Sequence, residues 1–142
     1  MKTVLIAAIL CCSIIVQGQL ADGLYKSNGR SFRQHYYLSV KNDSATLFGW
    51  EVVPGKDTVY FKSGRTACAG SNFTFNDFYF TKTRNTPDNL SKFSDDKSVA
   101  VSSALLHRHW SGIKQINGGI QMYAVNDIYD SRGDRFVFVK VK

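Results

Sequence analysis

Apolar and polar residues alternate with a period of two along much of the chain, most regularly over residues 35–53. Successive side chains of a β-strand point to opposite sides, so this alternation predicts strands with one apolar face. In the first half of this stretch, one face of the strand carries Tyr36, Leu38 and Val40. A tight turn at Asn42-Asp43-Ser44 follows. In the second half, one face carries Phe48, Trp50 and Val52, and we expect this face to point into the core.

A hairpin alone is marginally stable, so residues 35–53 need other strands beside them. The same alternation predicts such strands over residues 23–26, 58–62, 72–81, 120–129 and 135–141. Residues 99–110 fit either a strand or a helix, and we favour the strand. The polar residues 83–97 form the longest predicted loop.

The sequence predicts two turns between these strands and a bulge within one of them. Asn117-Gly118 between apolar runs predicts a type I′ hairpin, since that turn accepts positive backbone angles. The aromatic residues of 72–81 change parity between Phe75 and Phe78, so we expect a bulge near Asn76-Asp77. Residues 130–134 are predicted to turn into the last strand.

Eight or nine short strands with frequent turns predict an all-β fold. We favour a single antiparallel, mostly up-and-down β-barrel, because hairpin connections dominate and closure removes exposed strand edges. A β-sandwich is the alternative.

The N-terminus has the order of a secretory signal peptide: Lys2, an apolar run over residues 4–16, and a cleavage site between Gly18 and Gln19. We therefore predict residues 1–18 as the signal peptide and residues 19–142 as a single barrel domain of an exported protein, secreted, periplasmic or extracellular. The chain has a net charge of +7, which becomes +6 without Lys2. This excess of positive charge favours anionic partners or serves solubility.

Motifs of known enzyme classes are absent from the sequence, which has no phosphate-binding glycine loop, no nucleophile elbow and no His-Glu-x-x-His motif. Glu51 is the only glutamate, and we expect it on the outer face of its strand as a solvated acid. Inside the barrel it would instead be a desolvated carboxylate and a candidate acid or base.

The sequence also contains a lone cysteine in the predicted domain, two nearby histidines, an Arg-Gly-Asp tripeptide and three glycosylation sequons. Cys68 is the only cysteine of the predicted domain, and its small neighbours favour a buried structural thiol. His107 and His109 have a spacing that suits metal ligands, but two histidines are a weak signal and no cofactor is predicted. Arg132-Gly133-Asp134 spells an integrin-recognition tripeptide, which ordinary turn composition explains. Glycosylation sequons begin at Asn42, Asn72 and Asn89.

The opening Gly23-Leu24-Tyr25, the run of hairpins and the closing strand over residues 135–141 resemble the small exported lipocalin-like (calycin-type) β-barrel proteins. Tyr25 stands where typical lipocalins have a tryptophan. The resemblance implies a barrel that holds a small molecule in its interior.

These observations predict a secreted, monomeric, non-catalytic protein that binds a small apolar or amphipathic ligand. The residues expected to line the ligand site are Tyr36, Phe48, Trp50, Phe61, Phe73, Phe75, Phe136 and Phe138. The alternative is an extracellular module that binds an anionic glycan or protein through a basic surface made of Arg30, Arg33, Lys56, Lys62, Arg65, Lys82 and Arg84. A secreted hydrolase is third, and neither a nucleic-acid partner nor a membrane span is predicted.

Overall fold

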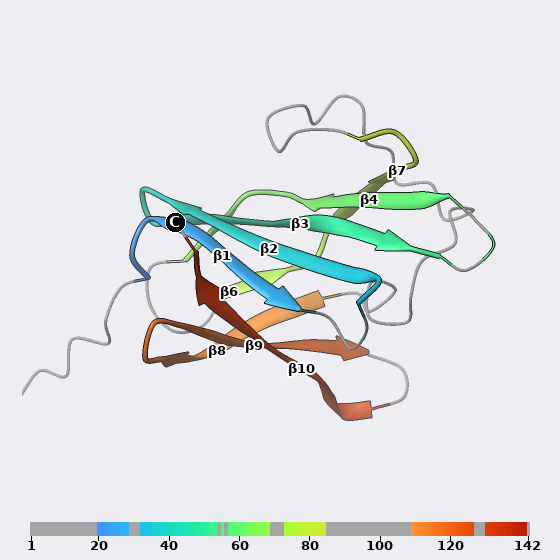
Figure 1. Ribbon diagram of the computed structural model, residues 1–142. Helices are drawn as coiled ribbons and strands as arrows, with labels where there is room; N and C mark the ends of the chain where they lie inside the picture. The colour runs from blue at the N-terminus through green and yellow to red at the C-terminus, as the bar shows by residue number, and fades with distance from the viewer. Residues whose placement is uncertain are drawn as a thin grey trace, which may run out of the picture.

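The computed structural model describes residues 20–28, 32–53, 55, 57–68, 73–84, 109–126 and 130–141. Every regular element in these ranges is a β-strand (Figure 1). The strands are β1 (Gly23–Asn28), β2 (Gln34–Lys41), β3 (Ser44–Val52), β4 (Thr58–Ser63), β5 (Thr66–Ala67), β6 (Phe73–Phe75), β7 (Phe78–Thr81), β8 (His109–Ile116), β9 (Gly119–Asn126) and β10 (Asp130–Lys140). The predicted signal peptide, residues 85–97 of the predicted loop and the ambiguous residues 99–108 lie outside the described residues.

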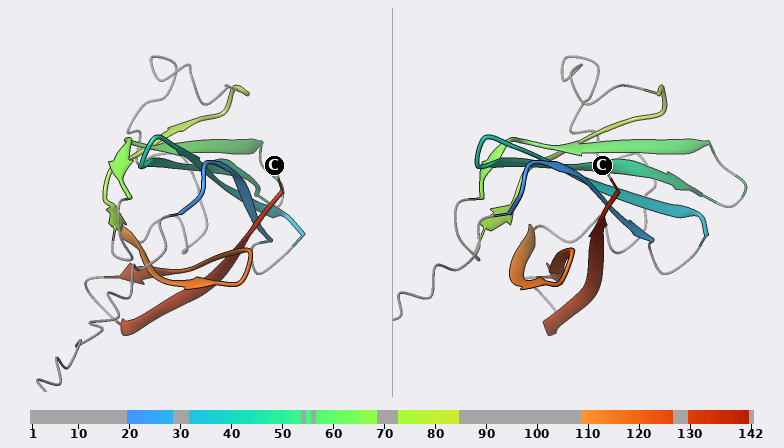
Figure 2. Two further views of the ribbon diagram at one scale, coloured as in Figure 1. Left: turned by 90° about the vertical axis from the view of Figure 1, so that its left-hand side faces the viewer. Right: turned by 60° about the vertical axis from the view of Figure 1, so that its left-hand side comes forward.

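All ten strands belong to one antiparallel sheet, in the order β6-β8-β9-β10-β1-β2-β3-β4-β7, with β5 paired to β3. Most neighbours are also consecutive in sequence, and β1 pairs with β10, which joins the two ends of the chain. Figure 2 shows the sheet curving around a common interior. The predicted all-β barrel is therefore confirmed as a nearly closed, mostly up-and-down barrel, and its nine-strand path agrees with the predicted number of strands.

The sheet turns a corner at Asn76 and Asp77, where a bulge was expected. β6 ends at Phe75 and pairs with β8, whereas β7 begins at Phe78 and pairs with β4. The interruption shifts the side-chain parity by one, so the aromatic residues on both sides of it are buried: Phe73, Phe75, Phe78 and Phe80. A break between two strands with different partners therefore accounts for the change of parity.

The turn between β2 and β3 has two residues, Asn42 and Asp43, with φ angles of 49° and 57°. Positive angles at both positions are those of a type I′ turn, which suits the twist of a hairpin. The turn pairs Lys41 with Ser44, and this register continues along both strands to the pairing of Gln34 with Glu51. Paired residues point to the same side of a sheet, so the inner face of β2 determines the inner face of β3.

The inner face of β3 is therefore the opposite of the predicted one. Leu47 and Gly49 point inward, and Leu47 pairs with the buried Leu38. Phe48 and Trp50 are only partly buried, on the outer face, and Val52 is exposed. A three-residue turn at Asn42-Asp43-Ser44 would shift the register by one residue, and such a shift exchanges the two faces of a strand.

Gly49 occupies a narrow place between two large inner side chains. It pairs with Tyr36 on one side and with Phe61 on the other. The Tyr36 and Phe61 rings meet edge to face with their centroids 5.6 Å apart. A Cβ atom at Gly49 would collide with the carbonyl oxygen of His35 and press on the Phe61 ring. Glycine therefore lets the two rings pack across β3.

One end of the barrel is closed by residues that flank the strands. The Tyr25 hydroxyl donates to the carbonyl oxygen of Ala21 at 2.8 Å, next to the buried Leu20. The Cys68 amide donates to the carbonyl oxygen of Asp43, also at 2.8 Å. The Cys68 bond holds the segment after β5 against the β2–β3 turn, and a 3.0 Å bond from the Asn42 amide to Asp22 Oδ1 holds the segment before β1 there.

The C-terminal strands confirm most of the expected pattern. Inward-pointing Phe136 and Phe138 are buried, whereas the alternate valines of β10 are exposed: Val137, Val139 and Val141. The hairpin at Asn117-Gly118 is confirmed, but only Gly118 has a positive φ angle, 76°, so the predicted type I′ geometry is wrong there. The predicted turn over residues 130–134 is also wrong, because these residues begin β10 with an irregular register.

Candidate functional site

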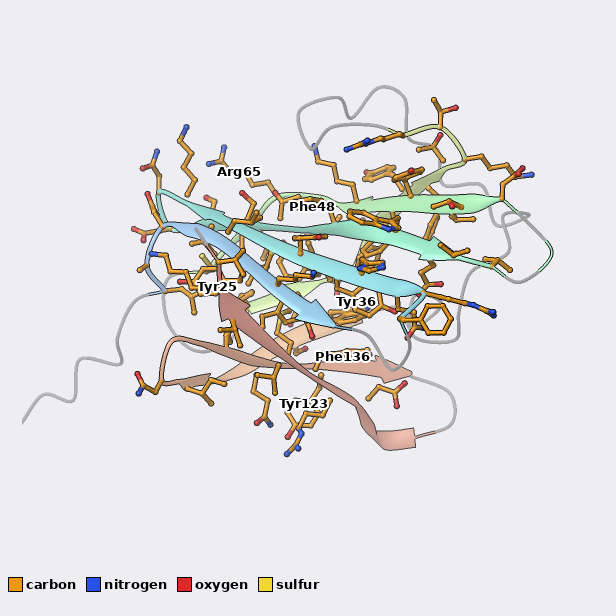
Figure 3. All side chains as sticks on the ribbon, viewed as in Figure 1. Tyr25, Tyr36, Phe48, Arg65, Tyr123 and Phe136 are labelled. Atoms are coloured by element: carbon orange, nitrogen blue, oxygen red, sulfur yellow. The ribbon has the colours of Figure 1, made fainter. Side chains whose placement is uncertain are left out.

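Four aromatic rings meet in the interior, with Tyr36 at their centre. Its ring lies edge-on to the rings of Phe61, Trp110 and Phe136, at centroid distances of 5.6, 5.2 and 5.3 Å. Trp110 and Phe136 stack on each other at 4.6 Å. Figure 3 shows the Tyr36 and Phe136 side chains between the two halves of the barrel. We call these four residues the aromatic cluster.

A carboxylate lies beside the aromatic cluster. Glu51 is only 2% exposed, and its Oε1 accepts a 2.7 Å hydrogen bond from the Tyr36 hydroxyl. The Gln34 amide nitrogen lies 3.4 Å from the same oxygen. The prediction that Glu51 is a solvated surface acid is therefore wrong, because the register of the β2–β3 hairpin turns it inward opposite Gln34.

Two further polar atoms of this region have no hydrogen-bond partner among the described residues. They are the Trp110 indole nitrogen, on a side chain that is fully buried, and the Gln34 Oε1. Buried polar groups in native proteins almost always have partners, either in the protein or in ordered water. The indole N–H donor and the amide acceptor could therefore each bond to ordered water or to a bound molecule.

The group formed by Glu51, Gln34 and the aromatic cluster is the candidate site. Gln34 is the first residue of β2 and Glu51 the second-last of β3, so the polar groups lie at one end of the barrel. The opposite end carries Cys68 and the β2–β3 turn. The site thus combines an aromatic wall with one carboxylate, one hydroxyl and one amide.

Six of the eight residues predicted to line a ligand site do point inward and are buried: Tyr36, Phe61, Phe73, Phe75, Phe136 and Phe138. Phe48 and Trp50 do not, because they lie on the outer face of β3. The prediction missed Glu51, Gln34 and Trp110 as interior residues. A signal was present for Glu51 and Gln34, since a two-residue turn places both on the inner face together with Tyr36.

The aromatic residues on the outer face form a stack of their own. Trp50 stacks on His35 at 4.9 Å and on Tyr37 at 5.3 Å, and Tyr37 stacks on Phe48 at 5.4 Å. The Lys26 ammonium lies over the Tyr37 ring, 5.9 Å from its centroid. Because the rings cover one another's faces, this stack serves as cross-strand packing that stabilises the sheet.

The basic residues predicted to form an interaction surface are distributed over several elements. Arg33, Arg65, Lys82 and Arg84 are exposed, whereas Arg30 and Lys56 lie outside the described residues. Lys62 is only 5% exposed, so it is not part of an accessible basic surface. Its register places it between Phe48 and Tyr79 on the outer side of the sheet. An anionic glycan or protein partner for the exposed cations stays a prediction.

The remaining predictions concern the Cys68 thiol, the metal-ligand histidines, the glycosylation sequons and a membrane span. Cys68 is buried and free, as expected of a structural thiol, and burial raises its pKa. His107, Asn72 and Asn89 lie outside the described residues. In the part of the chain that the structure describes, no three potential ligands gather to hold a metal ion. No helix within the described ranges is long and apolar enough to cross a membrane.

The Arg-Gly-Asp tripeptide at residues 132–134 lies within β10 and not at the tip of a hairpin. Comparison with protein-family models, with curated proteins and with solved structures gave no match to this chain.

Proposed function

We propose that this protein binds a small amphipathic molecule inside its barrel, next to Glu51, Gln34 and the aromatic cluster. One observation carries the proposal: the buried indole nitrogen of Trp110 and the Oε1 of Gln34 have no hydrogen-bond partner among the described residues. Ligand sites in proteins are mostly apolar, with a few polar groups that fix the ligand's orientation. The candidate site has this composition.

A solid structural core explains these groups less well. Burying a carboxylate is unfavourable unless other groups compensate it, and a barrel held together by packing alone has no need of one. Small barrels of about eight strands are either filled by their own side chains or hold one small ligand. The carboxylate and the amide at one end of a mostly apolar interior favour the second arrangement.

Binding is also favoured over catalysis. A hydrolase needs a nucleophile in hydrogen-bond contact with a base, and the described groups around Glu51 are a phenol, an amide and aromatic rings. The buried thiol of Cys68 belongs to the opposite end of the barrel, where its backbone is bonded to Asp43. The chemistry of the site therefore suits recognition.

The test is a binding screen of the purified protein by thermal shift and native mass spectrometry. The compounds are fatty acids, sterols, haem, quinones and organic amines, and the matched variant is Trp110→Phe, which keeps a ring and removes the indole donor. We expect at least one class to bind the native protein and to bind Trp110→Phe more weakly. An experimental structure with a fully packed interior, lacking a cavity of about 300 Å³ or more, would refute the proposal.

A further inference from the structure

The sheet is aromatic and apolar on part of its outer surface as well as in its interior. This outer surface consists of side chains of β2, β3 and β4, which the register sets side by side across the three strands. Val52 is 41% exposed, and each of the other side chains is partly exposed. We call this surface the outer aromatic face, and its residues are His35, Tyr37, Phe48, Trp50, Val52 and Tyr60.

The outer aromatic face is continuous. Trp50 contacts both His35 and Tyr37, at ring-centroid distances of 4.9 and 5.3 Å, and Tyr37 contacts Phe48 at 5.4 Å. Single apolar residues are normal on a protein surface, whereas a contiguous apolar patch with a polar border marks a site of interaction with a protein, a ligand or a membrane. Packing within the sheet therefore explains the contacts between the rings but not their shared exposure.

Cations border the outer aromatic face. Arg33 directly precedes β2, and its backbone is bonded to the end of β3. The Lys26 ammonium lies 5.9 Å from the centroid of the Tyr37 ring. Phe32, next to Arg33, is 82% exposed, and the acidic Asp57 is also exposed at this border. The net charge of the whole chain is +7, which attracts an anionic surface however the individual ion pairs are arranged.

The orientation of the rings indicates the kind of partner. Planar ligands such as nucleic-acid bases stack on exposed aromatic faces. Here the rings stack on one another, at interplanar angles of 25° and 27° on the two sides of Trp50, so they present edges to the solvent. A second copy of the chain would bring the same cationic border to both partners, which like charges disfavour. A bilayer interface accepts ring edges without shape complementarity, and Trp and Tyr concentrate there in membrane proteins.

We propose that the outer aromatic face docks this protein onto a lipid bilayer with anionic headgroups. The ring edges, Val52 and the Phe32 ring enter the interfacial layer of the bilayer. Lys26 and Arg33 extend their aliphatic stems along the apolar surface and contact the headgroup phosphates. The docking is peripheral and uses the outside of the barrel, so it is independent of the ligand site proposed for the interior.

Vesicle flotation of the purified protein tests the docking, with vesicles of phosphatidylcholine alone and vesicles that also contain phosphatidylglycerol. We expect binding to the anionic vesicles to be at least about tenfold tighter, and to weaken as the salt concentration rises. On binding, the emission of Trp50 should shift to the blue, and lipids with brominated chains should quench it. Equal binding to both kinds of vesicle, or binding to neither, would overturn the proposal.

Two valine variants locate the contact. Val52 and Val137 are 41% and 39% exposed, on the outer sides of β3 and β10. Val52→Glu places a charge in the outer aromatic face and should weaken vesicle binding at least about tenfold, because both apolar contact and electrostatic attraction are lost. Val137→Glu adds the same charge outside this face and should weaken binding by less than about threefold at physiological salt.

The variants and one further measurement also show what would contradict the proposal. Equal losses in Val52→Glu and Val137→Glu would mean that net charge, and not the outer aromatic face, governs binding. Retention of the native protein on heparin, without binding to vesicles, would identify an anionic glycan as the partner in place of a bilayer.

Discussion

The Tyr36 hydroxyl donates a 2.7 Å hydrogen bond to Glu51 Oε1 in the interior of the barrel. The two residues lie on neighbouring strands, β2 and β3, and both are almost completely buried. This bond joins the centre of the aromatic cluster to the buried carboxylate of Glu51. The site and the core therefore depend on the same tyrosine.

Replacing Tyr36 with phenylalanine should destabilise the protein by about 1.5–3 kcal/mol, because hydrogen bonds to charged groups contribute about that much and the buried carboxylate loses one of its donors. Tyr37→Phe is the matched control, since Tyr37 lies on the outer face. That control should change stability by less than about 0.5 kcal/mol. Urea unfolding measures both variants, and equal stability of the two would contradict the role given to the Tyr36 hydroxyl.

Gly49→Ala should destabilise the protein by about 1–3 kcal/mol, the usual effect of adding atoms to a well-packed core. The added methyl group would collide with the carbonyl oxygen of His35, a backbone atom held in the β2–β3 ladder, and with the Phe61 ring. Gly64→Ala is the control, because a Cβ there meets nothing within 4 Å. Thermal or urea unfolding should show a loss at Gly49 and no comparable loss at Gly64.

The two tryptophans should differ in their access to solvent. Trp50 is partly exposed on the outer face, and Trp110 is fully buried. In Trp110→Phe only Trp50 fluoresces, and iodide should quench its emission; in Trp50→Phe only Trp110 remains, and its emission should be blue-shifted and resist quenching. The reverse result would return Trp50 to the interior, where the sequence pattern alone placed it.

Stability should fall as the pH rises from about 8 to 9.5 because of Cys68. Burial raises the pKa of the Cys68 thiol above its usual value of about 8.5, and the charges of Asp43 and Asp22 raise it further. The unfolded chain then loses the proton at a lower pH than the folded chain does, so the thiol's contribution, complete at lower pH, diminishes as the pH rises through this window. Tyr25, whose pKa is raised from about 10 by burial and by Asp22, adds to this trend only at higher pH.

Urea unfolding across this pH range measures the effect, with Cys68→Ala as the comparison. The variant should show a flatter dependence of unfolding free energy on pH, whatever its absolute stability. An identical slope in both proteins would mean that the thiol does not titrate differently in the folded state.

The sequence by itself determined the fold class and most strands of this protein, because both depend on local signals. Alternation of period two identified the inner face of β2, and Asn42, Asp43 and Gly118 supplied the backbone conformations of the hairpin turns. The parity change between Phe75 and Phe78 located the corner of the sheet. Each of these features involves residues that are close together in the chain.

Only the tertiary structure decided which face of β3 points inward, because both faces of that strand carry apolar residues. The two-residue turn pairs Tyr36 with Gly49, where a Cβ atom would collide with the His35 carbonyl oxygen and press on the Phe61 ring. That register sends Phe48 and Trp50 outward and brings Glu51 beside Tyr36. A one-residue difference in a turn, too small to read from hydrophobicity, thus created the polar end of the barrel, since each residue of slip exchanges the two faces of a strand.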